Sequence, residues 1–256
     1  MRVAVLADIH GNLPALRAVL RELDAERVDA IVVAGDVVGG PYPREALELL
    51  AGRPEELMWI RGNSEREAVA ARDGEPPADD ESGRAAAWSA ERLNGEWRDR
   101  LDAWPIAAEL DGVLYCHGSP RRDDEVLTRA TPGDVLAEAL SGVREPVVVG
   151  GHTHQQIIRK ALGAPTYVNA GSVGMPYEGR AGAFWLIMNG NEPQLRETTY
   201  DIESALEELR ASGFPGVDEL IAESLLAPVD ADWVSAFFEH GAGRGENPGP
   251  PPSLAA

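Results

Sequence analysis

Short apolar segments recur along this chain, and each is followed by a polar or glycine-containing turn. They are rich in Val and Ile, and polar residues do not alternate with the apolar ones. Strands that are buried on both faces have this pattern. The predicted strands are 3–7, 30–34, 57–60, 113–116, 146–149, 166–168 and 183–188.

Helical patterns lie between several of these strands. One apolar stripe runs from Leu13 to Leu23, with Pro14 in its first turn, and further helices are predicted at 43–50 and 131–140. Strands that alternate with helices predict an α/β fold with a mostly parallel sheet. The segments 183–188 and 195–200 flank the turn 189–191, which predicts an antiparallel hairpin and a second sheet.

The chain carries 43 acidic and 23 basic residues, a formal net charge of −20. This charge argues against binding of long nucleic acid or of an anionic membrane, but it allows a small phosphorylated substrate. A single cysteine excludes an intrachain disulfide, and neither a membrane span nor a signal peptide is recognisable. We therefore expect a cytoplasmic protein, and homo-oligomerisation stays open.

Polar residues follow five of the predicted strands. Ligands of open α/β sheets bind beyond the carboxyl ends of the strands, so these side chains can converge on one crevice. Four of the five histidines belong to this set, and only His240 lies elsewhere. The candidate ligands are Asp8, His10, Asp36, Asn63, His117, His152 and His154.

This set mixes nitrogen and oxygen ligands and needs no thiolate, which suits Mn²⁺, Fe, Zn²⁺ or Ni²⁺ better than Mg²⁺ or Ca²⁺. Seven ligands are too many for one tetrahedral ion and suit two ions that share a carboxylate. In an extended segment residues i and i+2 point the same way, so Asp8 and His10 are expected to face one side. Glycines that precede ligands, such as Gly62 and Gly151, are expected where a side chain would obstruct the site.

The motifs Asp8-Ile9-His10, Gly35-Asp36, Gly62-Asn63, His117-Gly118 and Gly151-His152-Thr153-His154 occur in an order that resembles the calcineurin-like metallophosphoesterases. The resemblance extends to about Tyr200 and is strongest to the small bacterial and archaeal phosphodiesterases. It implies a four-layer αββα sandwich with two mixed sheets. The domain division that follows is a catalytic domain at 1–200, a packed helical extension at 201–240 and a disordered tail at 241–256.

The resemblance also implies a dinuclear metal centre. One ion would be held by Asp8, His10, Asp36 and His154, and the other by Asp36, Asn63, His117 and His152. Asp36 would bridge the ions, and a hydroxide between them would attack phosphorus in line. Manganese is the favoured ion, with iron, zinc and nickel as alternatives. Asp36, Asn63 and His117 are the residues to which a catalytic role is assigned.

One departure from the family concerns the residue after Asn63. The family usually has a histidine there, assigned to the substrate phosphate or the leaving group, whereas this chain has Ser64. A serine hydroxyl cannot act as a general acid near neutral pH. We therefore predict better activity on phosphodiesters with good leaving groups than on alkyl monoesters.

Other polar residues have competing interpretations. Besides Asn63, candidate substrate contacts are Asn12 and Arg121, although a helix cap and a solvent-exposed ion pair are the simpler interpretations. The acidic segment 72–84 is predicted to be a surface loop, with a lid as the alternative. The stripe of Trp233, Phe237 and Phe238 on a helix at 230–240 is interpreted as packing.

The sequence thus predicts a metal-dependent phosphoesterase, specifically a phosphodiesterase for small or nucleotide-like substrates. Two alternatives are a phosphoprotein phosphatase and a non-catalytic, metal-dependent scaffold.

Overall fold

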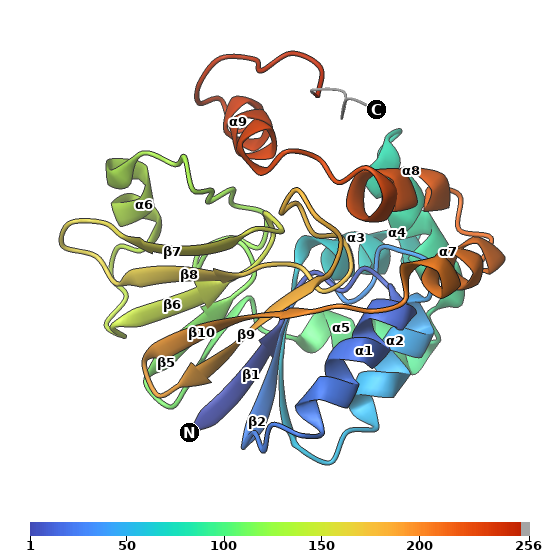
Figure 1. Cartoon of the computed structure of the whole chain (residues 1–256), viewed down its shortest axis with the longest axis horizontal. Helices are drawn as coiled ribbons and strands as arrows, with labels where there is room; N and C mark the ends of the chain where they lie inside the picture. Colours follow the sequence, from blue (N-terminus) through green and yellow to red (C-terminus); the bar gives the residue numbers. More distant parts are fainter. Residues whose placement is uncertain (252–256) are drawn as a thin grey trace.

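Two five-stranded sheets packed face to face form the centre of the structure, a computed structural model that describes residues 1–251 (Figure 1). The first sheet has the strand order β10-β9-β1-β2-β3, and the second has the order β4-β5-β6-β8-β7. The strands of the first sheet are β1 (Arg2–Leu6), β2 (Ala30–Ala34), β3 (Glu56–Ile60), β9 (Ala183–Asn189) and β10 (Glu192–Thr198). Those of the second sheet are β4 (Ala107–Leu110), β5 (Val113–Cys116), β6 (Val147–Gly150), β7 (Gln156–Lys160) and β8 (Thr166–Ala170).

Both sheets contain parallel neighbours whose carboxyl ends meet at one edge. In the first sheet β1, β2 and β3 are parallel, with Leu6 opposite Val33 and Ala34 opposite Ile60. In the second sheet β5, β6 and β8 are parallel. The remaining strands are antiparallel, including the predicted hairpin of β9 and β10, so both sheets are mixed. The loops after β1, β2 and β3 therefore emerge together.

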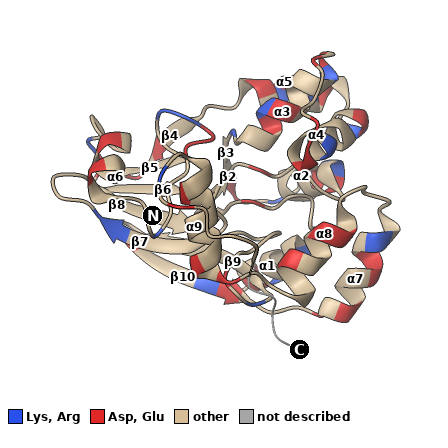
Figure 2. Cartoon of the chain, turned by 90° about the horizontal axis from the view of Figure 1, so that it is seen from above, with Lys and Arg blue, Asp and Glu red and all other residues tan. Residues whose placement is uncertain are grey.

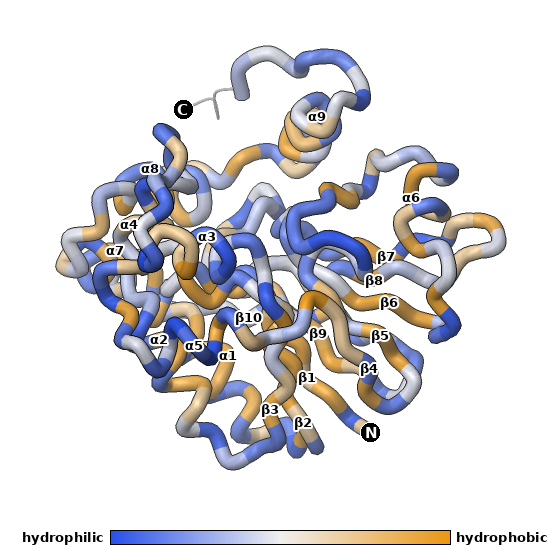
Figure 3. Tube along the Cα trace, turned by 180° about the vertical axis from the view of Figure 1, so that it is seen from behind, coloured by the Kyte–Doolittle hydropathy of each residue, from blue (hydrophilic) through white to orange (hydrophobic). Residues whose placement is uncertain are grey.

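The central strands of the two sheets lack polar alternation because both of their faces are covered. In β1, Val3 and Val5 face the layer between the sheets, whereas Ala4 and Leu6 face the helices. Figure 3 shows hydrophobic colour concentrated on the strands of both sheets. The pattern that predicted strands buried on both faces is confirmed.

Helices cover the outer face of each sheet, which completes the expected four-layer αββα sandwich. Helices α1, α2, α3 and α5 pack on the first sheet, α4 packs on α3, and α6 covers the second sheet. Their bounds are α1 (Leu13–Leu23), α2 (Pro43–Ala51), α3 (Asn63–Arg72), α4 (Glu81–Arg92), α5 (Gly95–Ala103) and α6 (Gly133–Ala139). No helix among residues 1–251 combines the length and apolar composition needed to cross a bilayer.

The prediction that 72–84 is entirely a surface loop is wrong at its carboxyl end. The irregular stretch covers 73–80, and α4 begins at Glu81. The Asp80 side chain accepts a hydrogen bond from the Gly83 N–H at 2.8 Å and so caps this helix. An acidic, proline-rich stretch is typical of a loop. Asp80 does not stand out as a helix cap within it, so little in the sequence indicates that α4 begins at Glu81.

Helical segments follow β10 and form the carboxyl-terminal part of the described chain. They are α7 (Ile202–Ala211), α8 (Val217–Ile221), the π-helical turn η1 (Ala222–Leu226) and α9 (Ala231–Gly241). Figure 1 shows α8 and α9 above the edge at which the parallel strands end. Within the predicted tail, residues 242–251 form no helix or strand, and 252–256 lie outside the described residues. The division at 200 and 240 stays a prediction.

Candidate metal centre

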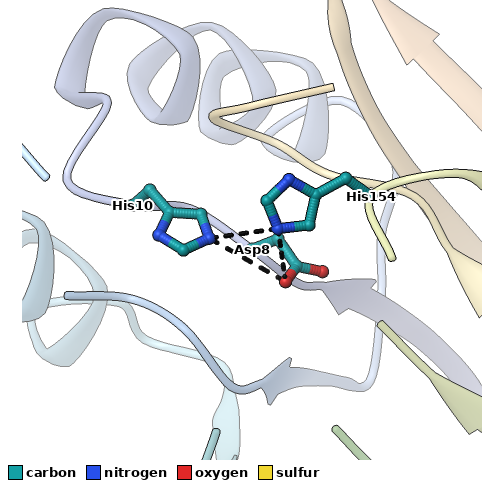
Figure 4. Close-up of side chains that lie close together, drawn as sticks. All are labelled: Asp8, His10 and His154. Atoms are coloured by element: carbon teal, nitrogen blue, oxygen red, sulfur yellow. Dashed lines mark hydrogen bonds and ion pairs between the residues drawn. The ribbon is translucent and has the colours of Figure 1, made fainter. Parts of the chain in front are cut away.

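Six acidic and histidine side chains from loops of both sheets form two clusters. Asp8, His10 and His154 form the first cluster, and Asp36, His117 and His152 form the second; within each, one ligand atom per residue lies within 4.8 Å of the others. Figure 4 shows the rings of His10 and His154 directed toward the Asp8 carboxylate. Four of the five predicted strand ends thus converge in the clusters, and Asn63, which follows the remaining strand, β3, lines the cavity that opens onto them.

The first cluster has the spacing of ligands that share one ion. The Nε2 atoms of His10 and His154 lie 3.2 Å apart, and His154 Nε2 lies 3.2 Å from Asp8 Oδ1. Two ligands at ~2.1 Å from a tetrahedral ion are themselves roughly 3.4 Å apart. The three donor atoms are therefore already placed to surround a cation.

Asp36 belongs to the second cluster and also faces the first. Its Oδ2 atom is 3.3 Å from His117 Nε2 in the second cluster and 3.6 Å from His10 Nε2 in the first. Its other oxygen, Oδ1, accepts the Ser64 backbone N–H at 2.9 Å. One carboxylate oxygen is thus fixed by the protein while the other faces both clusters, which is the arrangement that a bridging ligand needs.

Two buried ligand atoms have no hydrogen-bond partner in the described chain: His117 Nε2 and Asn63 Oδ1. A buried polar atom without a partner costs about 1–3 kcal/mol, so both positions call for a group that is not part of the chain. The Asn63 amide nitrogen lies 3.4 Å from Glu67 Oε1, which leaves the amide oxygen for a cation. These residues therefore fit a metal ion.

Backbone carbonyls fix two of the histidine rings. His117 Nδ1 lies 2.8 Å from the Ala34 carbonyl oxygen, and His154 Nδ1 lies 2.7 Å from the Met175 carbonyl oxygen. Each Nδ1–H donates to its carbonyl, so the Nε2 lone pair is free to bind a metal. Such hydrogen bonds set both the tautomer and the ring orientation.

The ionisation of the metal-free site is unevenly distributed. Burial is the largest effect on His117 and lowers its pKa, but the charges of Asp36 and Asp8 outweigh burial and raise the pKa to about 10. Burial, together with the charge of His117, lowers the pKa of His152 to about 4. Burial is the largest effect on Asp36 and raises its pKa, but the charge and hydrogen bond of His117 and the charges of His10 and His152 together hold this pKa well below its usual range. Burial also raises the pKa of Asp8, but the charges of His154 and His117 and a hydrogen bond from His154 outweigh it, so both aspartates are ionised and attract a cation.

The backbone at the candidate ligands is strained. Asp8, His10, Asp36, His152 and His154 all have φ between 45° and 70°, and within residues 1–251 only Arg27 and Asp111 among other non-glycine residues have positive φ. Left-handed non-glycine residues are uncommon and cluster at functional sites. Asp8 and His10 do join one cluster, as expected, but the reason given for it is wrong: both residues have a left-handed rather than an extended backbone conformation.

Glycines beside the ligands occupy positions that a side chain would fill. A Cβ atom on Gly62 would lie 2.1 Å from Asp36 Oδ1, and one on Gly151 would lie 2.6 Å from Asp8 Oδ2. The expectation that a side chain at these glycines would obstruct the site is confirmed. The atoms that it would meet are carboxylate oxygens of the candidate ligands Asp36 and Asp8.

Sequence reasoning missed Glu65, which is fully buried beneath the site. Its two carboxylate oxygens accept backbone N–H groups of Asp36, Val37 and Gly62 at 2.7–2.8 Å, and of Val38 at 3.2 Å. Glu65 therefore holds the loop after β2 in place. The available signal was an acidic residue two positions after a candidate ligand.

Two predicted substrate contacts lie elsewhere. Asn12 caps α1 by accepting the Ala15 N–H at 3.2 Å, and its amide donates to the Gly174 carbonyl at 2.8 Å, so both ends of the amide are occupied. Arg121 forms ion pairs with Glu125 at 2.6 Å and Glu138 at 3.3 Å and does not line the site cavity. The third contact, Asn63, lies at the site.

A cavity of about 270 Å³ opens onto the clusters. Five candidate ligands line it, while Asp8 and His117 lie fully buried behind them. Ser64 lines the same cavity. Sequence reasoning missed its apolar wall, which consists of Met175, Tyr177, Phe214, Leu220 and Phe238.

Comparison with known proteins identifies the family of this chain. A metallophosphoesterase from Sphaerobacter thermophilus has 26% sequence identity and a TM-score of 0.70, with 90% of this chain and 99% of that chain covered. A hypothetical protein from Pyrococcus horikoshii OT3 shares the fold, with a TM-score of 0.74, 23% identity and coverage of 87% and 96%. An uncharacterised protein of Methanocaldococcus jannaschii is 25% identical over 236 residues, which are 83% of this chain and 93% of that protein.

The family assignment rests on a match to more than half of the chain. Residues 1–156 match the model of the calcineurin-like phosphoesterases, and this segment contains all seven candidate ligands. The family implies hydrolysis of phosphate esters with divalent metal ions. The chain belongs to the calcineurin-like phosphoesterase family.

Proposed function

We propose that this protein is a dinuclear metal-dependent phosphodiesterase that hydrolyses small or nucleotide-like phosphodiesters. The observation that carries the proposal is the pair of adjacent Asp/His clusters, in which Asp36 Oδ2 lies within 3.6 Å of a histidine nitrogen of each cluster. The buried ligand atoms His117 Nε2 and Asn63 Oδ1 support it, because neither has a hydrogen-bond partner among the described residues.

The proposed ligand sets follow the clusters. Asp8, His10, Asp36 and His154 hold one ion, and Asp36, Asn63, His117 and His152 hold the other. When bound, two such ions supply a water of lowered pKa for in-line attack and neutralise the phosphate oxygens. The mixed nitrogen and oxygen ligands suit manganese, iron, zinc or nickel better than magnesium or calcium, and manganese is the ion that we propose.

The chain positions this chemistry through its own hydrogen bonds. The Ala34 and Met175 carbonyls orient the rings of His117 and His154, and the Ser64 N–H holds one oxygen of Asp36. Because Asp8 and His117 are fully buried, the substrate phosphate approaches from the cavity side, past Asn63.

The absence of a family histidine after Asn63 restricts the leaving group. Ser64 lines the cavity at the position after Asn63, and its hydroxyl cannot supply a proton near neutral pH. A leaving group that departs as a stabilised anion needs no such proton. Activated phosphodiesters are therefore preferred over alkyl monoesters.

The cavity and the charge favour a small substrate. About 270 Å³ accommodates a small phosphodiester, whereas a phosphoprotein phosphatase needs a groove for a peptide chain. The net charge of −20 opposes long nucleic acid and anionic membranes, and in Figure 2 the basic segments are scattered among acidic ones. Homo-oligomerisation and a cytoplasmic location stay predictions.

The test is hydrolysis of bis(4-nitrophenyl) phosphate by the manganese-loaded protein. We expect turnover that falls by at least about 10³-fold in Asp36→Asn and in His117→Ala, because each change removes a proposed ligand. His240→Ala is the matched control, since His240 is exposed on α9 outside the cavity, and it should retain full activity.

Two outcomes would contradict the proposal. If the protein binds manganese but releases no nitrophenolate from bis(4-nitrophenyl) phosphate, the scaffold alternative would be favoured. Faster hydrolysis of alkyl monoesters than of aryl diesters, or degradation of single-stranded DNA at physiological salt, would exclude the proposed substrate class.

A further inference from the structure

The cavity beside the clusters has a wall that the family segment does not supply. Phe214, Leu220 and Phe238 line it from the carboxyl-terminal helical part, beyond the matched residues 1–156. Met175 and Tyr177 complete the wall from the loop between β8 and β9. All five side chains are apolar or aromatic. Because all five lie beyond residue 156, the wall comes from outside the segment that matches the family.

The wall adjoins the first cluster directly. The Tyr177 ring stacks on the His154 ring with centroids 4.9 Å apart and an interplanar angle of 16°. The Tyr177 N–H donates to the His154 carbonyl at 3.1 Å, and the Phe238 ring lies 6.2 Å from that of Tyr177. A group attached to a phosphate at the clusters would therefore contact these rings.

Hydrogen bonds on both sides of Phe238 hold α9 in place. Gln155, the residue after His154, donates to the Ala231 carbonyl at 2.6 Å and accepts the Ser235 hydroxyl at 2.8 Å. Glu239 accepts the Thr128 and Thr131 hydroxyls at 2.7 and 2.6 Å. Phe238 lies between these anchors, so its position over the cavity is built into the fold.

The part of the wall formed by Phe214 and Leu220 is also fixed. Phe214 is 6% exposed and meets the Trp88 ring of α4 edge-on, with centroids 5.8 Å apart, and Leu220 is 1% exposed. Among the described residues that line the cavity none is Lys or Arg, whereas Glu67 and Glu81 do line it. An anionic group on this side would meet carboxylates and no cation.

We propose that this wall, formed by Met175, Tyr177, Phe214, Leu220 and Phe238, is a subsite for the second ester arm of the substrate and selects phosphodiesters whose arm is a flat, uncharged aromatic group. The inference rests on the proposed phosphodiesterase function. Apolar burial and ring contacts favour such an arm over a methyl group, because a methyl group buries far less surface.

The experiment uses three 4-nitrophenyl phosphodiesters that share one leaving group and differ in the second arm: phenyl, methyl or choline. For each, kcat/KM is measured with the manganese-loaded protein and with Phe214→Ala, Phe238→Ala and Phe237→Ala. The ratio of the kcat/KM values for two arms is compared between the wild type and each variant, because the intrinsic reactivity of each diester then cancels. Phe237 is the matched control: it neighbours Phe238 on α9, is 52% exposed and does not line the cavity.

We expect Phe214→Ala and Phe238→Ala each to lower the phenyl-to-methyl ratio about ten-fold, and Phe237→Ala to leave it unchanged. Calorimetric binding of diphenyl phosphate should weaken by a similar factor in the same two variants. If Phe238→Ala loosens α9, Phe238→Leu keeps the apolar volume and should lower the ratio by an intermediate factor.

The outcomes separate the two proposals. No nitrophenolate from any diester would overturn the phosphodiesterase function itself. Turnover with the same phenyl-to-methyl ratio in the wild type and in both cavity variants would overturn the subsite alone. A preference for the choline arm that is lost in these variants would also overturn it, because the rings would then select a cation.

Discussion

At the scale of single residues, the site depends on positions where no side chain fits. Gly62 lies against the Asp36 carboxylate, and Gly62 N–H donates to Glu65 Oε2 at 2.8 Å. A Cβ atom there would lie 2.1 Å from Asp36 Oδ1 and 2.7 Å from the Asp36 backbone nitrogen. The bridging candidate can therefore hold its orientation only beside glycine.

Gly62→Ala is expected to weaken manganese binding about 10- to 100-fold, the usual effect of displacing a group that orients a metal ligand. Gly95→Ala is the matched control, because a Cβ atom at Gly95 would meet nothing within 4 Å. Calorimetric titration of both variants with manganese checks this. Equal affinity in the two variants would show that Asp36 does not depend on this contact.

At the scale of elements, α9 is tied to the loop after β5 by a buried carboxylate. Glu239 is 5% exposed and forms an ion pair with Arg244 at 2.6 Å, besides accepting the Thr128 and Thr131 hydroxyls. Burial is the largest effect and raises the pKa of Glu239, but the hydrogen bonds from Arg244, Thr131 and Thr128 together outweigh it, and the net pKa is lowered. The ionised form is therefore the one that holds α9.

This lowered pKa predicts how stability varies with pH. A carboxyl group with a lower pKa in the folded state contributes its full stability above its unfolded pKa, near 4.5, and loses it as the pH falls through the folded value. Glu239→Gln should lower the free energy of unfolding by about 1–3 kcal/mol at pH 7. The difference in the free energy of unfolding between the wild type and Glu239→Gln should shrink steadily below pH 4.5.

Urea unfolding of wild type and Glu239→Gln at pH 7 and at pH 3.5 tests the prediction. Comparing the difference between the two proteins removes the titration of the other carboxylates. A difference of constant size at both pH values would mean that ionised Glu239 does not anchor α9. Glu91→Gln, at an exposed residue of α4, serves as the surface control.

At the scale of the whole molecule, the clusters join the two sheets. Asp8, His10 and Asp36 follow strands of the first sheet, whereas His117 and His154 follow strands of the second or the loop after them. Ions bound between these residues would connect the two halves of the sandwich. Metal removal is therefore expected to affect global stability and not only activity.

The manganese-loaded protein should melt at a higher temperature than the chelator-treated protein. An ion that binds only the folded state adds about 2.7 kcal/mol at a free concentration 100 times its Kd. Differential scanning calorimetry with manganese or with EDTA measures the shift, and Asp36→Asn should lose most of it. A shift of equal size in Asp36→Asn would place the stabilising ion elsewhere.

The candidate ligands could be found from sequence because local patterns mark them. Apolar strands buried on both faces are visible as continuous Val- and Ile-rich runs, and the first polar residues after them fall at the strand ends. The helix start at Glu81 and the short strands β4 and β7 were missed, because half-buried segments with mixed polarity lack this signal.

The sequence alone determined the Val- and Ile-rich strands, the helices predicted at 13–23, 43–50 and 131–140, the hairpin of β9 and β10, and the seven candidate ligands, since each is visible from residues close together in the chain. Only the tertiary structure decided how those side chains divide into two clusters, that left-handed turns aim them, and that Glu65 holds the loop beneath them. It also decided that Phe214 and Phe238 face the site, although Phe238 belongs to a stripe interpreted as packing. These features depend on contacts between residues far apart in the chain, and packing of the sheets and of α9 brings such residues together.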